Sequence, residues 1–351
     1  MSAIEQFELV PGYTTPRLIK GGWQLSAGHS DTPKNSALDD MMVFVDAGIT
    51  AFDCADIYTG VEELIGSFVT RLTNERGAQA RAALKIQTKF VPDLDALPTM
   101  DRAQVTTIIE RSLQRLQVER LDLVQFHWWD HTIPGREETG AMLVELQRAG
   151  KIDRLAGCND DAENLGALVN SGFPAVSNQV QFSLLDQRPT AEAPVFKKIG
   201  TPLICYGVLA GGFLTERWLG ATEPAEPLET RSHRKYLLVI EEFGGWALFQ
   251  ELLRTLDGIA RRHGTGIANV ATRWVLDQPG VAAAIIGARH TSQLADNLKT
   301  FDLALDDQDH AALNAVTSRR QGPAGPVFAL ERDREGPHGE IMAYNLNAGR
   351  R

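Results

Sequence analysis

Short apolar runs alternate along this chain with longer segments in which apolar residues recur at helical spacing. Runs at residues 49–52, 84–90 and 121–127 predict buried strands, and a segment of helical period follows each of them. Later runs at residues 155–158, 176–180, 203–206 and 283–286 predict further strands. Strict alternation of strand and helix implies parallel strands joined by right-handed crossovers. With a first strand that ends at Gly21, Gly22 and Trp23, the pattern predicts an α/β fold, the (β/α)8 TIM barrel.

Three segments depart from this alternation. Runs at residues 7–10 and 17–20 flank the turn formers Pro11 and Gly12, which predicts an N-terminal hairpin. The connection at residues 216–246, after the seventh strand, is too long for an ordinary loop, so we expect a lid or substrate loop that folds over a bound cofactor. The C-terminal tail at residues 319–351 interleaves aromatic and charged residues, and we expect it to pack on the barrel. The sequence thus predicts one domain over residues 1–351, with a barrel core at about 17–318.

Chemically active residues stand at the ends of three predicted strands. Asp53, Lys89 and His127 end the runs at 49–52, 84–90 and 121–127, and Tyr58 lies on the loop after Asp53. Side chains alternate with period two, so the three strand-end residues can all face the barrel interior. Singly, each residue has a structural explanation as a helix cap, a surface charge or a hydrogen-bonded core histidine. Their coincidence at one mouth, where barrels hold active sites, favours a catalytic site.

The composition narrows the class of protein. The formal net charge of -10 argues against a nucleic-acid partner, because neutralising phosphates requires clustered Lys and Arg. Cys54, Cys158 and Cys205 have no spacing typical of a metal cluster or disulfide framework, so we expect no metal site and a reducing compartment. Because no apolar run is long enough to span a bilayer and the first residues lack a secretory pattern, we expect a soluble, cytoplasmic protein with no membrane partner.

In this order and in these local contexts, Asp53, Tyr58, Lys89 and His127 resemble the catalytic tetrad of the aldo-keto reductases. The resemblance continues through GCND at 157–160, NQVQFSLLDQRP at 178–189, CYGVLAGGFLT at 205–215 and IIGARHTSQLADNL at 285–298. It implies an NAD(P)H-dependent oxidoreductase in which Tyr58 is the general acid. Lys89 would then be the cation that favours the Tyr58 phenolate, and Asp53 the partner of Lys89. His127 would hydrogen-bond the substrate oxygen.

The motifs that suggest a cofactor follow the seventh and eighth predicted strands. The glycine-rich loop at 207–212 matches neither a Rossmann fingerprint nor a P-loop, but barrels commonly hold phosphate after these two strands. The resemblance implies that Tyr206 stacks on a nicotinamide ring, whose carboxamide Asn159 and Gln179 hold. It further assigns cofactor contacts to Gly22, Trp23, Gly207, Leu209, Gly211, Gly287, Arg289, Gln293 and Asn297.

Two positions depart from the usual pattern of the family. Asp160 stands where the family usually has Asn, and because a carboxylate cannot donate like an amide, Asp160 could instead serve as a helix cap. Gly287 stands where many members have Lys, whereas Arg289 is the natural partner for a 2'-phosphate. We therefore expect NADP(H) as the cofactor, with NAD(H) as the alternative.

The resemblance also implies an apolar pocket for the substrate, lined by Trp23, Ile57, Trp128 and Trp129. Trp128 and Trp129 have opposite parity, so we expect only one of them to face the substrate. The predicted function is NADPH-dependent reduction of an aldehyde or ketone. Two alternatives stay open: an NAD(P)-dependent dehydrogenase of a sugar or other alcohol, and a cofactor-binding regulatory subunit similar to the potassium channel β subunits. The sequence leaves the physiological substrate and the oligomeric state open.

Overall fold

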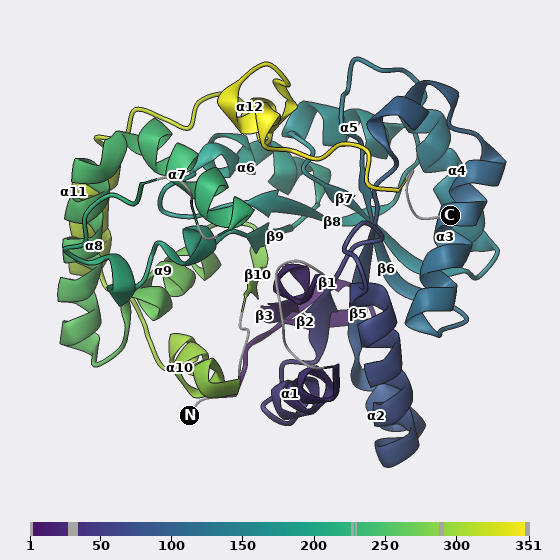
Figure 1. The fold of residues 1–351 in the computed structure, drawn as a ribbon, viewed down its shortest axis with the longest axis horizontal. Helices are drawn as coiled ribbons and strands as arrows, with labels where there is room; N and C mark the ends of the chain where they lie inside the picture. Colours follow the sequence, from purple (N-terminus) through teal and green to yellow (C-terminus); the bar gives the residue numbers. More distant parts are fainter. Residues whose placement is uncertain (1–2, 27–33, 226–227, 229, 288–290, 348–351) are drawn as a thin grey trace.

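Parallel strands form a closed barrel at the centre of the structure (Figure 1). This computed structural model describes residues 3–347 except 27–33, 226–227, 229 and 288–290. Each strand pairs in parallel with its neighbours, and β10 closes the barrel on β3. In chain order the strands are β3 (Leu18–Gly21), β4 (Ala51–Asp53), β5 (Lys85–Phe90), β6 (Leu121–His127), β7 (Ile152–Cys158), β8 (Ala175–Gln181), β9 (Leu203–Tyr206) and β10 (Val281–Ile286). The predicted TIM barrel is therefore confirmed.

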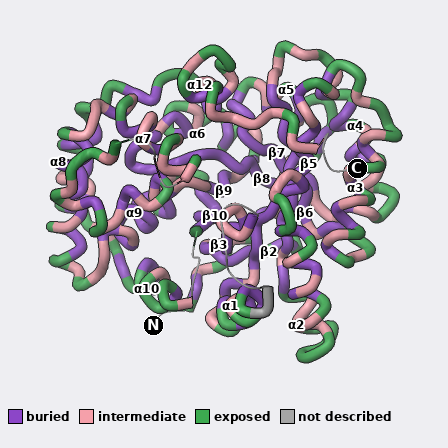
Figure 2. Tube along the Cα trace, in the orientation of Figure 1, coloured by how far each residue is buried: buried purple, intermediate pink, exposed green. Residues whose placement is uncertain are grey.

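Helices connect the strands and cover the outside of the barrel. Figure 2 shows the strands and the inward faces of these helices as buried, and the outward helix faces as exposed. Asp101 and Gln104 cap α3, because each side chain accepts a hydrogen bond from the other's backbone N–H at 2.8 Å. The main helices are α1 (Lys34–Asp46), α2 (Val61–Ala83), α3 (Arg102–Leu116), α4 (Arg136–Arg148), α5 (Ala162–Asn170), α6 (Arg188–Ile199), α8 (Gly245–His263), α9 (Ile267–Leu276), α10 (Leu294–Leu298) and α11 (Asp307–Thr317).

Side-chain alternation gives the barrel strands two different faces. On β6, Leu123 joins an interior apolar cluster with Ile19 and Ala51, whereas Val124 and Phe126 join the cluster between the strands and the helices. The period of two therefore places His127 on the interior side, above Leu123. The barrel interior is apolar toward the amino ends of its strands and polar toward their carboxyl ends.

The N-terminal hairpin is shorter than the sequence pattern predicts. β1 (Gln6–Val10) pairs antiparallel with β2 (Tyr13–Pro16). Gly12 has φ of 79°, which suits a tight two-residue turn and lets the second strand begin at Tyr13. Residues from Leu18 onward form the first barrel strand instead. The assignment of residues 17–20 to the hairpin is therefore wrong.

The two long segments fold onto the barrel. Residues 216–246 contain the short η4 (Glu216–Trp218) and the helix α7 (Arg231–Phe243). The tail contains α12 (Ala329–Arg332), drawn in yellow near α6 in Figure 1, and α13 (Pro337–Glu340). Val327 and Phe328 of the tail are buried. The predicted packing of the tail on the barrel is confirmed.

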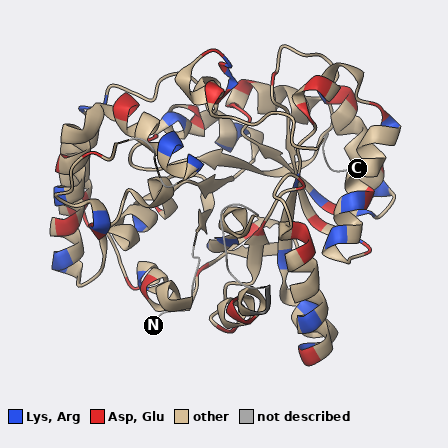
Figure 3. Ribbon diagram, in the orientation of Figure 1, with Lys and Arg blue, Asp and Glu red and all other residues tan. Residues whose placement is uncertain are grey.

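Charged residues of both signs share the outer helices (Figure 3). On α2 and α8, for example, Arg71 pairs with Glu75 and Arg261 pairs with Asp257, one helical turn apart. Within the described part of the chain, no helix is both long enough and apolar enough to cross a membrane.

Candidate active site

A buried ion pair joins the ends of the neighbouring strands β4 and β5. Lys89 Nζ lies 2.8 and 2.7 Å from the two carboxylate oxygens of Asp53, and it also donates to the Cys54 carbonyl at 2.8 Å. Burial alone would lower the pKa of Lys89, but the Asp53 charge, the hydrogen bond to Asp53 and the neighbouring Tyr58 and Cys158 together outweigh it, and the pKa is raised. Lys89 is therefore a cation at neutral pH, and both of its partners hold it in place.

Tyr58 lies beside this cation. Lys89 Nζ is 5.2 Å from the centre of the Tyr58 ring, and the Trp23 ring packs edge-on at 4.9 Å. A backbone hydrogen bond of 3.0 Å from Tyr58 to Ala55 holds the loop in a turn. Burial raises the pKa of Tyr58 to about 12, and Lys89 acts against this increase. At neutral pH Tyr58 is thus a phenol with a hydrogen to donate.

His127 presents one ring nitrogen to a carbonyl and leaves the other without a partner. Nδ1 lies 3.1 Å from the Cys158 carbonyl oxygen, which can only accept, so Nδ1 carries the hydrogen. Burial is the main cause that lowers the pKa of His127 to about 3, so the ring is neutral. Nε2 is then a bare acceptor, and it is buried with no hydrogen-bond partner among the described residues.

The residues predicted to hold a nicotinamide lie together next to the ion pair. Gln179 donates to Asp53 Oδ1 at 2.6 Å, and Tyr206 donates through its hydroxyl to Asn159 Oδ1 at 2.9 Å. Backbone bonding of Asn159 N to the Gln179 carbonyl at 2.8 Å keeps the two amides adjacent. No described residue bonds the side-chain oxygen (Oε1) of Gln179 or the side-chain nitrogen (Nδ2) of Asn159. One free acceptor beside one free donor fits a carboxamide group.

The glycine-rich loop after β9 is covered by α7. Gly207 and Gly211 have φ of 71° and 63°. A Cβ at these positions would lie 2.4 and 2.6 Å from atoms of Tyr236, so only glycine lets α7 approach this closely. At its other edge α7 reaches η1 (Trp23–Leu25), just after β3, where the Trp23 indole donates to Ser232 at 3.2 Å. The predicted lid segment therefore packs on the loop and beside the tetrad.

The other predicted cofactor contacts follow the barrel strands β3, β9 and β10. Gly22 donates its N–H to the Asp53 carbonyl at 2.7 Å, and the Gln24 side chain packs against Gly287. Leu209 packs on the apolar core, within the loop that α7 covers. Gln293 and Asn297 lie beyond β10, at the end of η5 (Thr291–Gln293) and in α10. Arg289 lies outside the described residues.

The two tryptophans after β6 face different surroundings. Trp129 packs edge-on against His127 at 4.4 Å and donates to the Pro92 carbonyl at 2.9 Å. Trp128 packs against Phe126 at 5.9 Å on the outer side of the strand. The two rings therefore lie on opposite sides of the strand end, as their parity predicts, and Trp129 is the one beside His127. Ile57 is partly buried against the core, next to Tyr58.

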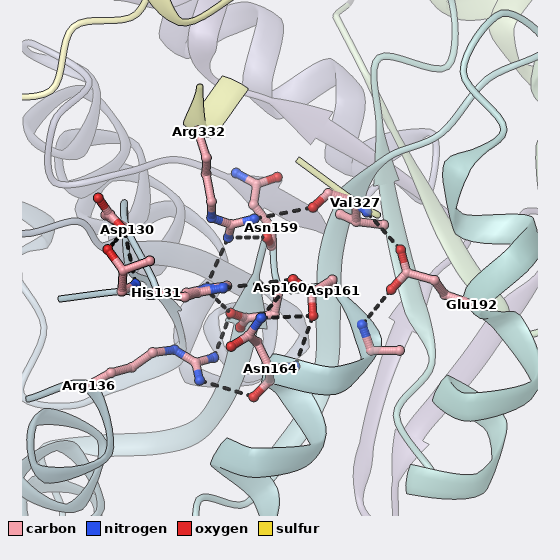
Figure 4. A network of polar contacts seen from close by, with 12 residues as sticks. Asp130, His131, Arg136, Asn159, Asp160, Asp161, Asn164, Glu192, Val327 and Arg332 are labelled. Atoms are coloured by element: carbon pink, nitrogen blue, oxygen red, sulfur yellow. Dashed lines mark hydrogen bonds and ion pairs between the residues drawn. The ribbon is translucent and has the colours of Figure 1, made fainter. Parts of the chain in front are cut away.

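Asp160 is held by Arg136 and lies beside His131 rather than capping a helix. Arg136 donates to Asp160 Oδ1 at 2.6 Å, and His131 Nε2 lies 3.2 Å from the same oxygen (Figure 4). Burial acts to raise the pKa of Asp160, but the Arg136 charge helps to hold this pKa below its usual value. The cap of α5 is Asp161, which accepts from the Asn164 N–H at 2.9 Å. The alternative role of Asp160 as a helix cap is therefore wrong.

Sequence reasoning misses three tail residues that reach the site. The Phe328 ring packs edge-on against His127 at 5.5 Å, and Tyr344 packs against Trp129 at 5.1 Å. Arg332 donates to the Asn159 carbonyl at 2.7 Å. Composition indicates that the tail packs, but no local pattern identifies its partners, which lie far away in the sequence.

One group of side chains in the described residues has metal-ligand geometry, away from the tetrad on α8 and α11. It consists of His263, Asp306 and Asp309. The Arg262 guanidinium already pairs with both carboxylates, at 2.7 Å to Asp306. The Arg262 cation bonds both acids and His263 Nε2 lies 2.7 Å from Asp309, so these side chains already occupy one another's polar atoms.

Comparison with known proteins extends the resemblance over most of the chain. The sequence profile of the Aldo/keto reductase family matches residues 17–318. The aldo-keto reductase YhdN of Bacillus subtilis is 26% identical over 92% of this chain and 97% of its own length. A crystal structure of a thermostable aldo-keto reductase in complex with the inhibitor epalrestat is 25% identical, with a TM-score of 0.69 over 89% of this chain and all of that one. The glycerol dehydrogenase of Gluconobacter oxydans shares the fold, at 23% identity and a TM-score of 0.76 over 93% of this chain and 99% of its own.

Proposed function

Because the chain belongs to the aldo/keto reductase family, whose members are NAD(P)-dependent oxidoreductases, we propose that it reduces an aldehyde or ketone with NADPH and that Tyr58 is the general acid. The observation that supports this most is the buried Asp53–Lys89 pair with the Tyr58 ring 5.2 Å from its cation. A carbonyl needs a proton as it receives a hydride, and a phenol beside a fixed cation can supply one.

Each member of the tetrad has a separate task in this proposal. Tyr58 donates its phenolic hydrogen to the carbonyl oxygen, and Lys89 stabilises the phenolate that remains. Asp53 fixes Lys89 through both carboxylate oxygens. The bound cofactor supplies the hydride.

His127 acts as an acceptor. A carbonyl oxygen has no hydrogen to give, so the bare Nε2 of His127 cannot bond it in this tautomer. Donation to the carbonyl therefore falls to Tyr58. The alcohol product carries a hydroxyl hydrogen, which Nε2 can accept, so His127 orients the reduced form.

For the cofactor, we assign the nicotinamide end to Asn159, Gln179 and Tyr206. The free donor and acceptor on the two amides match the two halves of a carboxamide. The loop at 207–212, the segment at 216–246 and the residues Gln293 and Asn297 would hold the rest of the dinucleotide. Arg289 would bind the 2'-phosphate and so favour NADP(H) over NAD(H).

The direct test is cofactor-dependent turnover. Purified protein is mixed with NADPH or NADH and a panel of aldehydes and ketones, and the reverse reaction is measured with sugars and alcohols. We expect NADPH-dependent reduction, and we expect Arg289→Ala to remove most of the preference for NADPH. Turnover only with NAD and alcohols would support the dehydrogenase instead. Cofactor binding without turnover would support a regulatory subunit.

A further inference from the structure

Arg332 is an arginine of the tail whose guanidinium contacts two backbone carbonyls and an imidazole ring. It donates to the carbonyls of Asn159 at 2.7 Å and Val327 at 3.2 Å, and it lies 3.1 Å from His131 Nε2 (Figure 4). Its Nε–H is buried with no acceptor in the described part of the chain. No described carboxylate lies within ion-pair distance of this side chain, so its charge has no direct partner.

Neighbouring buried arginines are compensated differently. Arg136 pairs with Asp160 at 2.6 Å, and Arg188 pairs with Asp186 at 2.6 Å. Burial acts to lower the pKa of Arg188, but Asp186 and Glu331 raise this pKa. Burial lowers the pKa of Arg332, and the more distant carboxylates of Asp160 and Asp161 offset this only in part. The cationic form of Arg332 is thus under-stabilised, and an anion beside it would be favourable.

The position of Arg332 links this cation to the candidate active site. Its guanidinium carbon lies 5.3 Å from the centre of the Phe328 ring, and that ring packs against His127. On its other side Arg332 touches the carbonyl of Asn159, the residue assigned to the nicotinamide. Arg332 is partly buried as a residue, and its Nε–H is the donor left without an acceptor among the described residues. A substrate between His127 and Asn159 would therefore have a cation within reach.

We infer that the carbonyl substrate carries an anionic oxygen group, a carboxylate or a phosphate, and that Arg332 binds it. A guanidinium offers parallel N–H donors that match either group, and Arg332 has one donor to spare. This inference rests on the proposed function, because it describes the substrate of the same site. It makes Arg332 a specificity residue and gives no role to it in proton transfer.

Matched pairs of substrates test the inference. Turnover with NADPH is compared for 4-carboxybenzaldehyde against benzaldehyde, and for glyceraldehyde 3-phosphate against glyceraldehyde, which separates carboxylate from phosphate. We expect the wild type to prefer the charged member of at least one pair. Arg332→Gln should reduce that preference by roughly ten- to one-hundred-fold, mainly through KM. Arg332→Lys should restore part of the preference, because it keeps the charge but not the fork.

Arg334→Gln is the matched control. Arg334 lies two residues further along the tail and is mostly exposed, so its loss should leave the preference unchanged. If Arg332→Gln lowers kcat/KM equally for charged and uncharged substrates, Arg332 only anchors the tail and the inference is wrong. A wild type that prefers the uncharged members of both pairs contradicts it equally.

A binding measurement separates this inference from the proposed function. Calorimetry compares benzoate with benzamide, and inorganic phosphate with buffer, on the wild type and on Arg332→Gln. Tighter binding of an anion that the substitution removes supports the inference even if no carbonyl compound is turned over. Equal binding to both proteins overturns it even if benzaldehyde is reduced well.

Discussion

At the scale of single residues, the hydrogen that Tyr58 carries decides the chemistry. The carbonyl of Cys158 fixes the hydrogen of neutral His127 on Nδ1, away from Nε2. Lys89 also carries hydrogens, but its ammonium group donates them to Asp53 and the Cys54 carbonyl. In the proposed reaction Tyr58 is therefore the hydrogen donor, and we expect that its neighbours do not rescue its loss.

Tyr58→Phe should reduce the turnover of aldehydes by about a hundred-fold or more, the scale of a lost general acid. NADPH affinity should stay nearly unchanged, because the ring and its packing against Trp23 remain. Single-turnover kinetics and fluorescence titration measure the two quantities separately. A variant that reduces a good aldehyde at the wild-type rate would show that another group is the acid.

The two directions of the reaction should respond differently to pH. Burial raises the pKa of Tyr58 to about 12, so the phenol needed for reduction persists from pH 7 to 10. Oxidation of an alcohol needs the phenolate, whose fraction rises about ten-fold for each pH unit below the pKa. We expect a flat rate of reduction and a rising rate of oxidation over this range. Lys89→Met should lower oxidation at every pH, because the cation that lowers the pKa of Tyr58 is lost. Reduction that declines between pH 7 and 9 would contradict this assignment.

At the scale of elements, the packing of α7 on the glycine-rich loop can be tested with two glycines. Gly207→Ala places a Cβ 2.4 Å from the Tyr236 hydroxyl, whereas a Cβ at Gly212 meets no atom within 4 Å. Both positions have positive φ, so both substitutions cost about 1–2 kcal/mol of backbone strain. Only Gly207→Ala should also displace α7.

The expected result is a larger loss of stability, and faster hydrogen exchange in α7, for Gly207→Ala than for Gly212→Ala. Urea unfolding and exchange mass spectrometry measure these effects. Equal behaviour of the two variants would mean that α7 moves aside at no cost and that its contact with the loop is loose.

The strands and the tetrad could be predicted because their signals are local. Apolar runs mark the strands, and parity assigns His127 and Trp129 to one side and Trp128 to the other. The hairpin was harder to predict, because the second strand is decided by the positive φ of Gly12, which a sequence pattern does not show. A turn two residues long and a turn six residues long both fit that sequence.

The contacts of the tail could not be predicted at all. Arg332 bonds a carbonyl of Asn159, and a carbonyl is present at every position, so no residue type marks the partner. Phe328 has φ of 62°, a conformation that bulky residues rarely adopt and that tertiary contacts must hold in place. A substitution in the sequence, Asp160 in place of the usual Asn, was the one visible sign of a charged network there.

At the scale of the whole molecule, one buried carboxylate joins three separate segments. Glu331 of the tail accepts from Arg188 of α6 at 3.1 Å and pairs with Lys235 of α7 at 3.5 Å. Glu331 thereby holds both α7, which packs on the glycine-rich loop, and the tail segment whose Phe328 packs against His127.

Glu331→Gln should cost about 3 kcal/mol of the free energy of unfolding at pH 7, because it leaves two buried cations short of an anion. Burial acts to raise the pKa of Glu331, but Lys235 and Arg188 lower this pKa to about 2. A lowered folded pKa stabilises the protein above the unfolded value near 4.5, and this stability is lost as pH falls toward 2. The gap between wild type and variant in urea unfolding should therefore shrink from pH 7 to pH 3. Glu335→Gln, an exposed neighbour, is the control and should change little at either pH.

Hydrogen exchange adds a second measurement: with NADPH bound, α7 and α12 should be protected together in the wild type, and only α7 in Glu331→Gln. Joint protection in both proteins would show that the two segments are coupled without this carboxylate.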